Sequence, residues 1–220
     1  MKIIKYIHSC LVVEKGLDRI MFDPGLFTFV EGLVKPSQFK NIQAIILTHC
    51  HPDHIDEESL KQIIKNNPKT VVLANTEIVG KLAEKNIQAE IFEGGQLVIS
   101  SFVLEAFDAP HEPLLADELP QNTAYLVDGN ILHPGDSLSK NLYGLKNTAI
   151  LALPMMAPWA TELQVYHFAR QMSPQYVIPI HDGFAKDFFL KSRYHNFQKY
   201  FTQNNIQFQW MNKAGDFFEV

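Results

Sequence analysis

The chain has 220 residues, a formal net charge of -5, and 46% hydrophobic and 20% charged residues. This composition is typical of a soluble globular protein and excludes the class of disordered chains with low hydrophobicity and high charge. There is no excess of Lys and Arg to neutralise phosphates, which disfavours a nucleic-acid partner. A chain of this length can bury a sizeable core, and we expect a single domain over residues 1–220.

No stretch reaches the length of a membrane span, and polar residues interrupt the apolar N-terminus before it could act as a secretion signal. The two cysteines, Cys10 and Cys50, are too few for a disulfide framework. We therefore expect a cytoplasmic protein without a membrane partner that acts on a small molecule. The pattern leaves its oligomeric state open.

Short apolar runs bounded by turn residues predict strands, and helical spacing of apolar residues predicts helices. The expected strands cover residues 3–6, 10–14, 19–22, 44–48, 70–74, 88–92, 96–99, 102–107, 123–127, 130–132, 149–152, 176–180 and 207–211. The expected helices cover residues 57–65, 76–86, 161–172 and 186–203. The first strands are expected to be antiparallel, and the whole order suggests two packed sheets with helices outside.

The segment His49-Cys50-His51-Pro52-Asp53-His54 directly follows the expected buried strand 44–48. In extended chain its first two histidines point to the same side, while the cysteine between them points away and is expected in the core. The aspartate and the last histidine lie on a turn that can fold back to a second position. One loop could therefore supply ligands to two neighbouring cations, which explains this density better than surface histidines and a helix cap do.

Three more candidates each follow a predicted strand: His111, Asp136 and His181. Taken singly, they could be a loop histidine, a turn-forming aspartate and a strand-end histidine. Loops at strand ends gather to make functional sites, however, and a metal needs more ligands than one loop provides. The sequence therefore predicts that these three side chains complete a metal site.

The order His-x-His-x-Asp-His, a later His, Gly-Asp and a final His resembles the metallo-β-lactamase fold superfamily over nearly the whole chain. The segments His8-Ser9-Cys10, Phe22-Asp23-Pro24 and Pro179-Ile180-His181 are similar to a branch of small metal-dependent hydrolases related to the ascorbate-phosphate lactonases. The resemblance implies an α/β (α+β) fold, an αββα four-layer sandwich with its site at one edge between the sheets.

The resemblance also implies the ligands of two divalent metal ions. One ion would be held by His49, His51 and His111, the other by Asp53, His54 and His181, and Asp136 would bridge them. Asp53 and Asp136 are the candidate catalytic residues, and Asp53 is expected to orient the attacking oxygen. Zinc suits imidazole ligands best, and the carboxylates also permit manganese or iron.

Other residues are expected around the site or outside it. His8, His133 and Asp23 are candidates for contacts with the ligands or with the substrate. His167 and His195 lie in expected helices and are interpreted as packing or solvated residues. The segment 153–159, Leu-Pro-Met-Met-Ala-Pro-Trp, either lines the pocket or packs into the core as a connector.

These features predict a hydrolase. Two divalent ions roughly 3.5–4 Å apart can share a hydroxide that would attack an ester, lactone or phosphodiester. One alternative is a metal-binding or sensor protein without turnover, because ligands alone do not establish catalysis. The other is a di-iron redox protein of the same fold, although such proteins carry a glutamate where this chain has His51.

Overall fold

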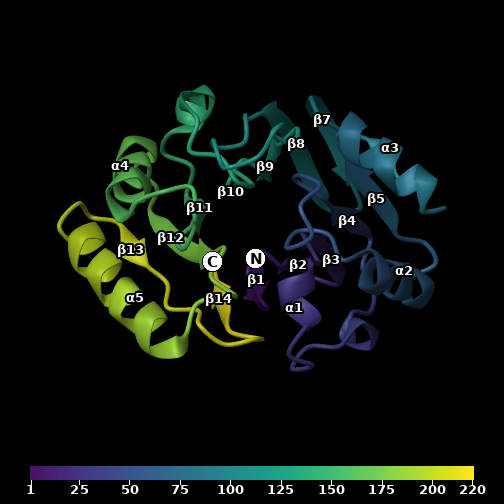
Figure 1. Ribbon diagram of the computed structural model, residues 1–220, viewed down its shortest axis with the longest axis horizontal. Coiled ribbons are helices and arrows are strands. Elements are labelled where there is room, and N and C mark those ends of the chain that lie inside the picture. Colours follow the sequence, from purple (N-terminus) through teal and green to yellow (C-terminus); the bar gives the residue numbers. More distant parts are fainter.

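The computed structural model describes all 220 residues and shows two packed sheets with helices on both outer faces (Figure 1). Each sheet has seven strands. The first sheet contains, in spatial order, β14 (Phe217–Glu219), β1 (Lys2–Lys5), β2 (Leu11–Lys15), β3 (Asp18–Phe22), β4 (Ala44–Ile46), β5 (Val71–Ala74) and β6 (Glu90–Ile91). The second contains β13 (Gln207–Phe208), β12 (Tyr176–Ile180), β11 (Ile150–Pro154), β10 (Ile131–His133), β9 (Thr123–Val127), β8 (Phe102–Asp108) and β7 (Gly95–Ile99). The predicted four-layer αββα sandwich is confirmed.

Helices cover the outer face of each sheet (Figure 1). Those beside the first sheet are α1 (Leu26–Phe29), α2 (Glu57–Asn66) and α3 (Thr76–Glu84), and those beside the second are α4 (Glu162–Met172) and α5 (Asp187–Thr202). Two 3-10 helices lie at η1 (Pro36–Gln38) and η2 (Lys140–Leu145). None of the helices is long and apolar enough to cross a membrane.

Each sheet is antiparallel at one side and parallel at the other. Strands β14 to β3 pair antiparallel and β3 to β6 pair parallel. In the second sheet, β7 to β10 pair antiparallel and β10 to β13 pair parallel. The candidate site residues lie at or just after the ends of strands β1, β3, β4, β8, β10 and β12. This topology gathers their loops from both sheets.

Alternating side chains explain why the strands pack on both faces. Ile46 of β4 lies in the core between the sheets, and its neighbour Ile45 lies in the core beneath the helices of the first sheet. Likewise, Ala152 of β11 faces the central core and Leu151 faces α4 and α5. Strands buried on both faces read as nearly continuous apolar runs, which is the pattern from which they were predicted.

Some elements differ from their predicted extents. Strand β13 ends at Phe208 instead of residue 211, and α1, both 3-10 helices and β14 were not predicted. Helices this short show no periodicity. Strand β14 forms because Phe217–Glu219 pairs with β1 across the length of the chain, and a pairing at that separation leaves no local signal. The two chain ends meet there: the Met1 amine donates to the Val220 carbonyl at 2.5 Å.

A cavity made in the central core should lower the free energy of unfolding. Phe102 is fully buried between the sheets. We expect Phe102→Ala to lower the free energy of unfolding by about 3–5 kcal/mol, measured by denaturant titration, since both the transfer of the ring and the cavity left behind are unfavourable. Leu17→Ala, at a side chain that is 93% exposed, is the control and should change it by less than about 0.5 kcal/mol. Equal effects of the two variants would contradict this description of the core.

Candidate metal centre

Two groups of potential metal ligands lie next to each other where the loops of both sheets meet. In each group, one ligand atom per residue lies within 4.8 Å of the others. The first group contains His49, His51, His111 and Asp136, and the second contains His8, Asp53, His54 and His181. The fold thus brings together all seven predicted ligands, from four separate parts of the sequence, and adds His8 from a fifth.

The first group is held so that ring nitrogens face a common point. His49 Nε2 lies 3.1 Å from His51 Nδ1, close to the roughly 3.3 Å between two nitrogens on one tetrahedral zinc ion. The other nitrogen of His49 contacts Thr48 Oγ1 at 3.1 Å, and His111 Nδ1 donates to the Glu112 carbonyl at 2.7 Å. The rings of His49 and His111 are therefore anchored through the nitrogens that face away from the group.

Cys50 points away from this group, as expected from its place between two histidines. Its Sγ lies 3.2 Å from a Glu77 oxygen and 2.9 Å from Lys81 Nζ. The side chain is half-buried against the core beneath α2 and α3 instead of lying fully inside it. It contributes nothing to the candidate metal centre.

In the second group, a buried carboxylate orients His54. Asp23 Oδ2 accepts from His54 Nδ1 at 2.8 Å and from the Thr48 hydroxyl at 2.7 Å, and Asp23 Oδ1 accepts from the Thr48 amide at 2.9 Å. This carboxylate–histidine pair fixes the proton on Nδ1 and leaves His54 Nε2 free to bind a metal. The predicted role of Asp23 as a neighbour of the ligands agrees with this geometry.

The carboxylate of Asp136 lies between the two groups. Asp136 Oδ1 is 3.3 Å from His54 Nε2, whereas Oδ2 is 3.0 Å from His181 Nε2 and 3.6 Å from His111 Nε2. The indole of Trp159 donates to Oδ2 at 3.1 Å, an interaction that no sequence pattern indicated. This position is the one that a bridging ligand requires.

A tight turn delivers Asp136 to this position. Gly135 has φ +61°, and a Cβ on it would lie 2.1 Å from Asn122 Oδ1 and 3.0 Å from Thr48 Cβ, so no larger residue fits. The same Asn122 oxygen accepts from the Asp136 amide at 3.1 Å. Asn122 was not predicted, because its role depends on contacts between loops that are distant in sequence.

His8 is a donor to Asp53, not a ligand. The Gly183 amide donates to His8 Nδ1 at 3.1 Å, so the neutral ring carries its proton on Nε2, which lies 3.1 Å from Asp53 Oδ2. Burial and the nearby charge of His181 lower the pKa of His8 to about 4, which keeps the ring neutral near pH 7. A neutral imidazole has one free nitrogen, and here it is already occupied. His8 therefore contacts a candidate ligand, Asp53, which is one of the roles predicted for it.

A buried ion pair holds the loop of His181 against the first sheet. His181 Nδ1 donates to the Met156 carbonyl at 3.1 Å, which directs Nε2 to the centre. The next residue, Asp182, lies 2.5 Å from Lys5 Nζ and also accepts from the Tyr194 hydroxyl, and both charged residues are buried. Lys5 is a charged residue at the end of an apolar strand. This pattern could have indicated from the sequence that Lys5 is buried and paired. Removing one partner of such a pair leaves an uncompensated buried charge.

The remaining predicted residues lie outside the two groups. His133 is buried behind the centre, stacks on Phe22 with ring centres 5.1 Å apart and points its Nε2 at Asp23 Oδ2 from 4.0 Å. His167 and His195 lie on α4 and α5 and belong to neither group. His195 instead packs on a tryptophan with ring centres 4.8 Å apart.

Buried atoms without partners show that the centre fits a metal. His54 Nε2, His111 Nε2 and Asp136 Oδ1 are buried and make no hydrogen bond. Buried polar atoms in native proteins are normally paired, and a cation would satisfy all three of these. Imidazole nitrogens with carboxylate oxygens are a ligand set typical of zinc and compatible with other transition metals.

The charges of the centre also favour a cation. Burial raises the pKa of the Asp136 carboxyl, but the charges of His181 and His54 lower it more, well below its usual range. Burial likewise raises the pKa of the Asp53 carboxyl, but the hydrogen bond from His8 and the nearby charges of His54 and His181 together lower it below its usual range. Both groups are therefore carboxylates at neutral pH. The pKa of His54 changes in the opposite direction. Burial lowers this pKa, but the nearby carboxylates of Asp136 and Asp23 raise it well above its usual range.

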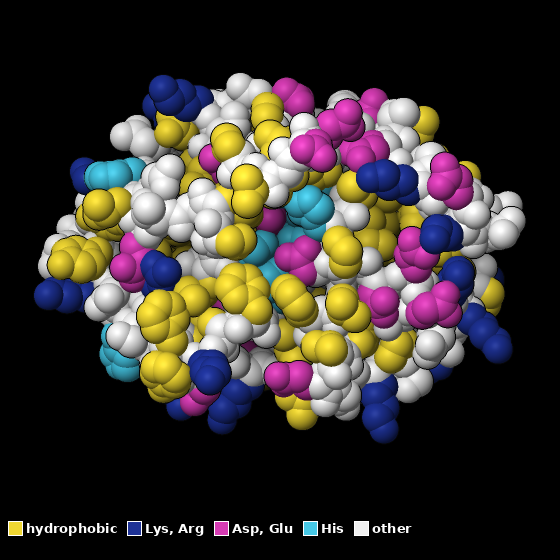
Figure 2. Space-filling view, in the orientation of Figure 1, with side chains coloured by type: hydrophobic (Ala, Val, Ile, Leu, Met, Phe, Trp, Pro, Cys, Tyr) yellow, Lys and Arg dark blue, Asp and Glu magenta, His cyan; other side chains and the backbone are white.

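A cavity of about 800 Å³ opens in front of these atoms. It is lined by His51, Asp53, Pro113, Leu114, Leu115, Asp136, Pro158, Trp159 and His181. Figure 2 shows histidine side chains at the bottom of this hollow, surrounded mostly by hydrophobic side chains. Segment 153–159 both packs into the core and lines the pocket, the two interpretations that the sequence left open. Met155 and Met156 are buried in the core, while Pro158 and Trp159 line the cavity.

The contact between Asp23 and His54 gives a first prediction. We expect Asp23→Asn to weaken zinc binding about 10- to 100-fold, because an amide does not hold the proton of His54 on Nδ1 as a carboxylate does. A competition titration with a chromogenic chelator measures the affinity. His167→Ala, a change on α4 outside both groups, is the control. Equal affinity of the Asp23 variant and the unchanged protein would show that this pair does not orient a ligand.

Proton release on metal binding gives a second prediction. The pKa of His54 and that of His181 are raised in the metal-free protein, mainly by Asp136 acting against burial, whereas a metal-bound imidazole is neutral. The metal-free state thus binds more protons, so metal affinity should rise with pH through the neutral range. Calorimetry at pH 7 in buffers of different ionisation enthalpy should show net proton release. A binding enthalpy independent of the buffer would contradict this charge assignment.

Comparison with known proteins agrees with this geometry. Residues 2–181 match the family model described as "Beta-lactamase superfamily domain". The chain is 30% identical over 191 residues to Protein Rv0786c of Mycobacterium tuberculosis, covering 83% of this chain and 84% of the relative. It is 25% identical over 189 residues to a UPF0173 metal-dependent hydrolase of Flavobacterium johnsoniae, covering 85% and 75% of the two chains.

A solved structure shows the same fold. Igni18, a metallo hydrolase from the archaeon Ignicoccus hospitalis, superimposes with a TM-score of 0.73 at 20% identity, covering 100% of this chain and 98% of that one. The matched family segment contains all the residues of both ligand groups. The expected resemblance is confirmed: this chain belongs to the β-lactamase superfamily and is a metal-dependent hydrolase with the metallo-β-lactamase fold.

Proposed function

We propose that this protein is a dinuclear hydrolase that cleaves an ester, lactone or phosphodiester bond in a small molecule, with zinc as its metal and manganese or iron as other candidates. One observation carries the proposal. The Asp136 carboxylate lies between two sets of imidazoles: its Oδ1 is 3.3 Å from His54 Nε2 of one set, and its Oδ2 is 3.6 Å from His111 Nε2 of the other. A single carboxylate so placed can serve two cations.

The ligand assignment follows from the free ring nitrogens. One ion would be held by His49, His51 and His111, and the other by Asp53, His54 and His181, with Asp136 shared. His8 is left out because its only free nitrogen accepts from the Gly183 amide. Each ion would then have three ligands of its own and share the carboxylate of Asp136.

When bound, the two ions would lower the pKa of a shared water to near neutrality, so that hydroxide is available as the nucleophile, and would polarise the scissile bond. The side chains of the protein hold this arrangement. Asp53 lines the cavity as a carboxylate fixed by His8 and orients the attacking oxygen. Trp159 lines the cavity and donates to Asp136 Oδ2, which holds this carboxylate in place.

The setting of this activity is part of the proposal. We assign residues 1–220 to a single catalytic domain, since both ligand groups draw on both sheets. Its two cysteines are free and suit a reducing cytoplasm. A net charge of -5 is consistent with a small-molecule substrate in preference to nucleic acid.

Metal content and turnover, measured together, test the function. Elemental analysis of protein purified without added metal should find about two transition-metal ions per chain, and a panel of esters, lactones and phosphodiesters should include a substrate. His51→Ala should lose metal and lower kcat/KM by more than about 100-fold, since even the loss of a group that only orients a ligand costs 10- to 100-fold. Asp136→Ala should weaken the binding of both ions.

His167→Ala is the matched control, a histidine on α4 that should leave metal content and turnover unchanged. Bound metal without turnover of any substrate would favour the metal-binding or sensor alternative. A chain that binds no metal after reconstitution, or a His51 variant with normal metal content and turnover, would disprove the proposal.

A further inference from the structure

The walls of the cavity in front of the metal centre are apolar. Pro113, Leu114 and Leu115 of the loop after β8 and Pro158 and Trp159 of the loop after β11 supply the apolar part of its lining. The polar residues of the lining are all candidate metal ligands, namely His51, Asp53, Asp136 and His181. Every charged or imidazole side chain in the lining is therefore a candidate ligand of the metal centre, and the side chains left to contact the rest of a substrate are apolar or aromatic.

Exposed apolar side chains belong to this surface and continue it outside the cavity. Leu115 is fully exposed and Phe184 is 48% exposed. The Phe184 ring centre lies 5.8 Å from those of His8 and His181, and 6.1 Å from that of Phe27. Large apolar side chains clustered around an open site usually mark a surface that a ligand covers. Because these side chains lie next to the candidate metal ligands, the part of a bound molecule that contacts them would be close to its reacting bond.

The cavity also lacks any group that would hold an anion. None of the residues that line it is Lys or Arg, the side chains that recognise carboxylate and phosphate groups. The loop that carries Leu115 continues instead with the exposed acidic residues Asp117 and Glu118. A substrate with a free phosphate or carboxylate would find no partner away from the metals and would meet negative charge at the border.

We propose, building on the hydrolase function above, that the substrate is an uncharged ester or lactone with an apolar acyl part that lies between Leu115 and Trp159. The volume of about 800 Å³ is within the range of sites that enclose small molecules with a medium-length chain or a ring. Water adds to the acyl carbon, the bond from that carbon to the leaving oxygen breaks, and a proton of the water ends on the leaving oxygen. An ester gives a carboxylic acid and an alcohol, and a lactone gives a single hydroxy acid.

Chain length and charge separate this substrate class from the others. We would compare p-nitrophenyl acetate, p-nitrophenyl hexanoate and the p-nitrophenyl half-ester of adipic acid, which share a leaving group. The hexanoate has four more methylenes than the acetate, and full burial contributes about fourfold per methylene. We therefore expect kcat/KM to be about 10- to 100-fold higher for hexanoate than for acetate. The adipate half-ester, which ends in a carboxylate, should be at least about tenfold poorer than hexanoate.

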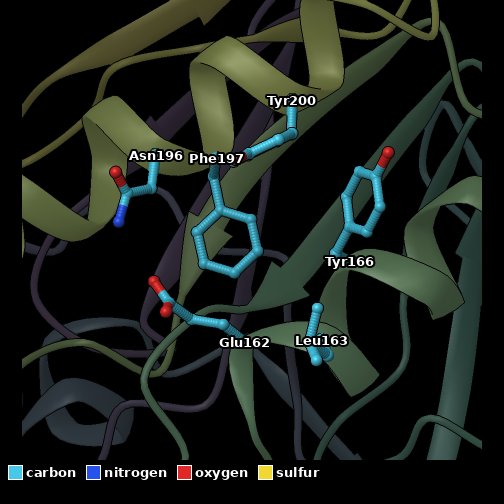
Figure 3. A pocket seen from close by; sticks show the side chains of 6 residues that line it. All are labelled: Glu162, Leu163, Tyr166, Asn196, Phe197 and Tyr200. Carbon is cyan, nitrogen blue, oxygen red and sulfur yellow. The ribbon is translucent and has the colours of Figure 1, made fainter.

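A matched pair of variants locates the preference. Leu115→Lys places a cation at the cavity wall and should lower the hexanoate-to-adipate ratio at least about fivefold, without a change in thermal unfolding because the side chain is fully exposed. Leu163→Lys is the control: Leu163 is 67% exposed and lines a different groove, between α4 and α5, together with Tyr166 and Tyr200 (Figure 3). No candidate ligand lines that groove, so the ratio should not change.

Binding without turnover gives an independent readout. Trp159 and Trp210 are the only tryptophans, so in Trp210→Phe the indole fluorescence reports on the cavity alone. Titration of the zinc-loaded variant with acetohydroxamate and hexanohydroxamate compares two ligands with the same metal-binding group. We expect the affinity for hexanohydroxamate to be at least about tenfold higher, because its chain contacts the apolar walls.

The outcomes separate the substrate class from the hydrolase function. Equal turnover of hexanoate and acetate, faster turnover of the adipate half-ester, or a preference for bis(p-nitrophenyl) phosphate would overturn the substrate class and leave the hydrolase intact. If the metal-loaded protein hydrolyses nothing, the proposed function fails, and the hydroxamate titration still decides whether the cavity selects apolar chains. Equal affinities for the two hydroxamates would overturn the inference in that case too.

Discussion

The Asp136 carboxylate and the imidazoles on either side of it are the interaction on which the rest of the centre depends. Its oxygens lie 3.0–3.6 Å from His54, His111 and His181, which come from different loops of the fold. In the metal-free protein, this carboxylate offsets part of the repulsion among neighbouring histidines and raises the pKa of His54. The turn at Gly135, the Asn122 side chain and the Trp159 indole hold it in place. The geometry of both ligand groups is therefore built around one buried negative charge.

The second requirement is that the ring nitrogens facing the centre stay free. The protein meets it by anchoring the opposite nitrogens: His54 to Asp23, His111 to the Glu112 carbonyl and His181 to the Met156 carbonyl. These anchors come from both sheets, so the sandwich as a whole acts as the scaffold. The pair Lys5–Asp182 and the contact of His8 with Gly183 tie the first sheet to the loop after β12. Local disturbance of either sheet edge should reach the metal ligands through these ties.

Ligands and cavity walls carry different information about function. The ligand set matches what a metal-dependent hydrolase of this superfamily requires, and it sets the type of reaction. The walls of Leu115 and Trp159 belong to loops, where related proteins of one fold differ most. A shared fold therefore does not carry a shared substrate. For this chain, the absence of cationic side chains from the lining and the abundance of apolar ones are the features that bear on what enters.

The sequence by itself determined the fold class, most strands and helices, and the candidate ligands. Buried strands are continuous apolar runs, and the ligands are chemically distinctive residues clustered at 49–54 or placed after strands. Only the tertiary structure decided how Asp136 sits between the two groups, that His8 donates to Asp53, and that Thr48, Asn122 and Lys5 support the centre. It alone also paired β14 with β1. The reason is physical: alternation and spacing are local, whereas a hydrogen bond between loops depends on how far-separated segments pack, and the same short polar side chains serve equally well in ordinary turns.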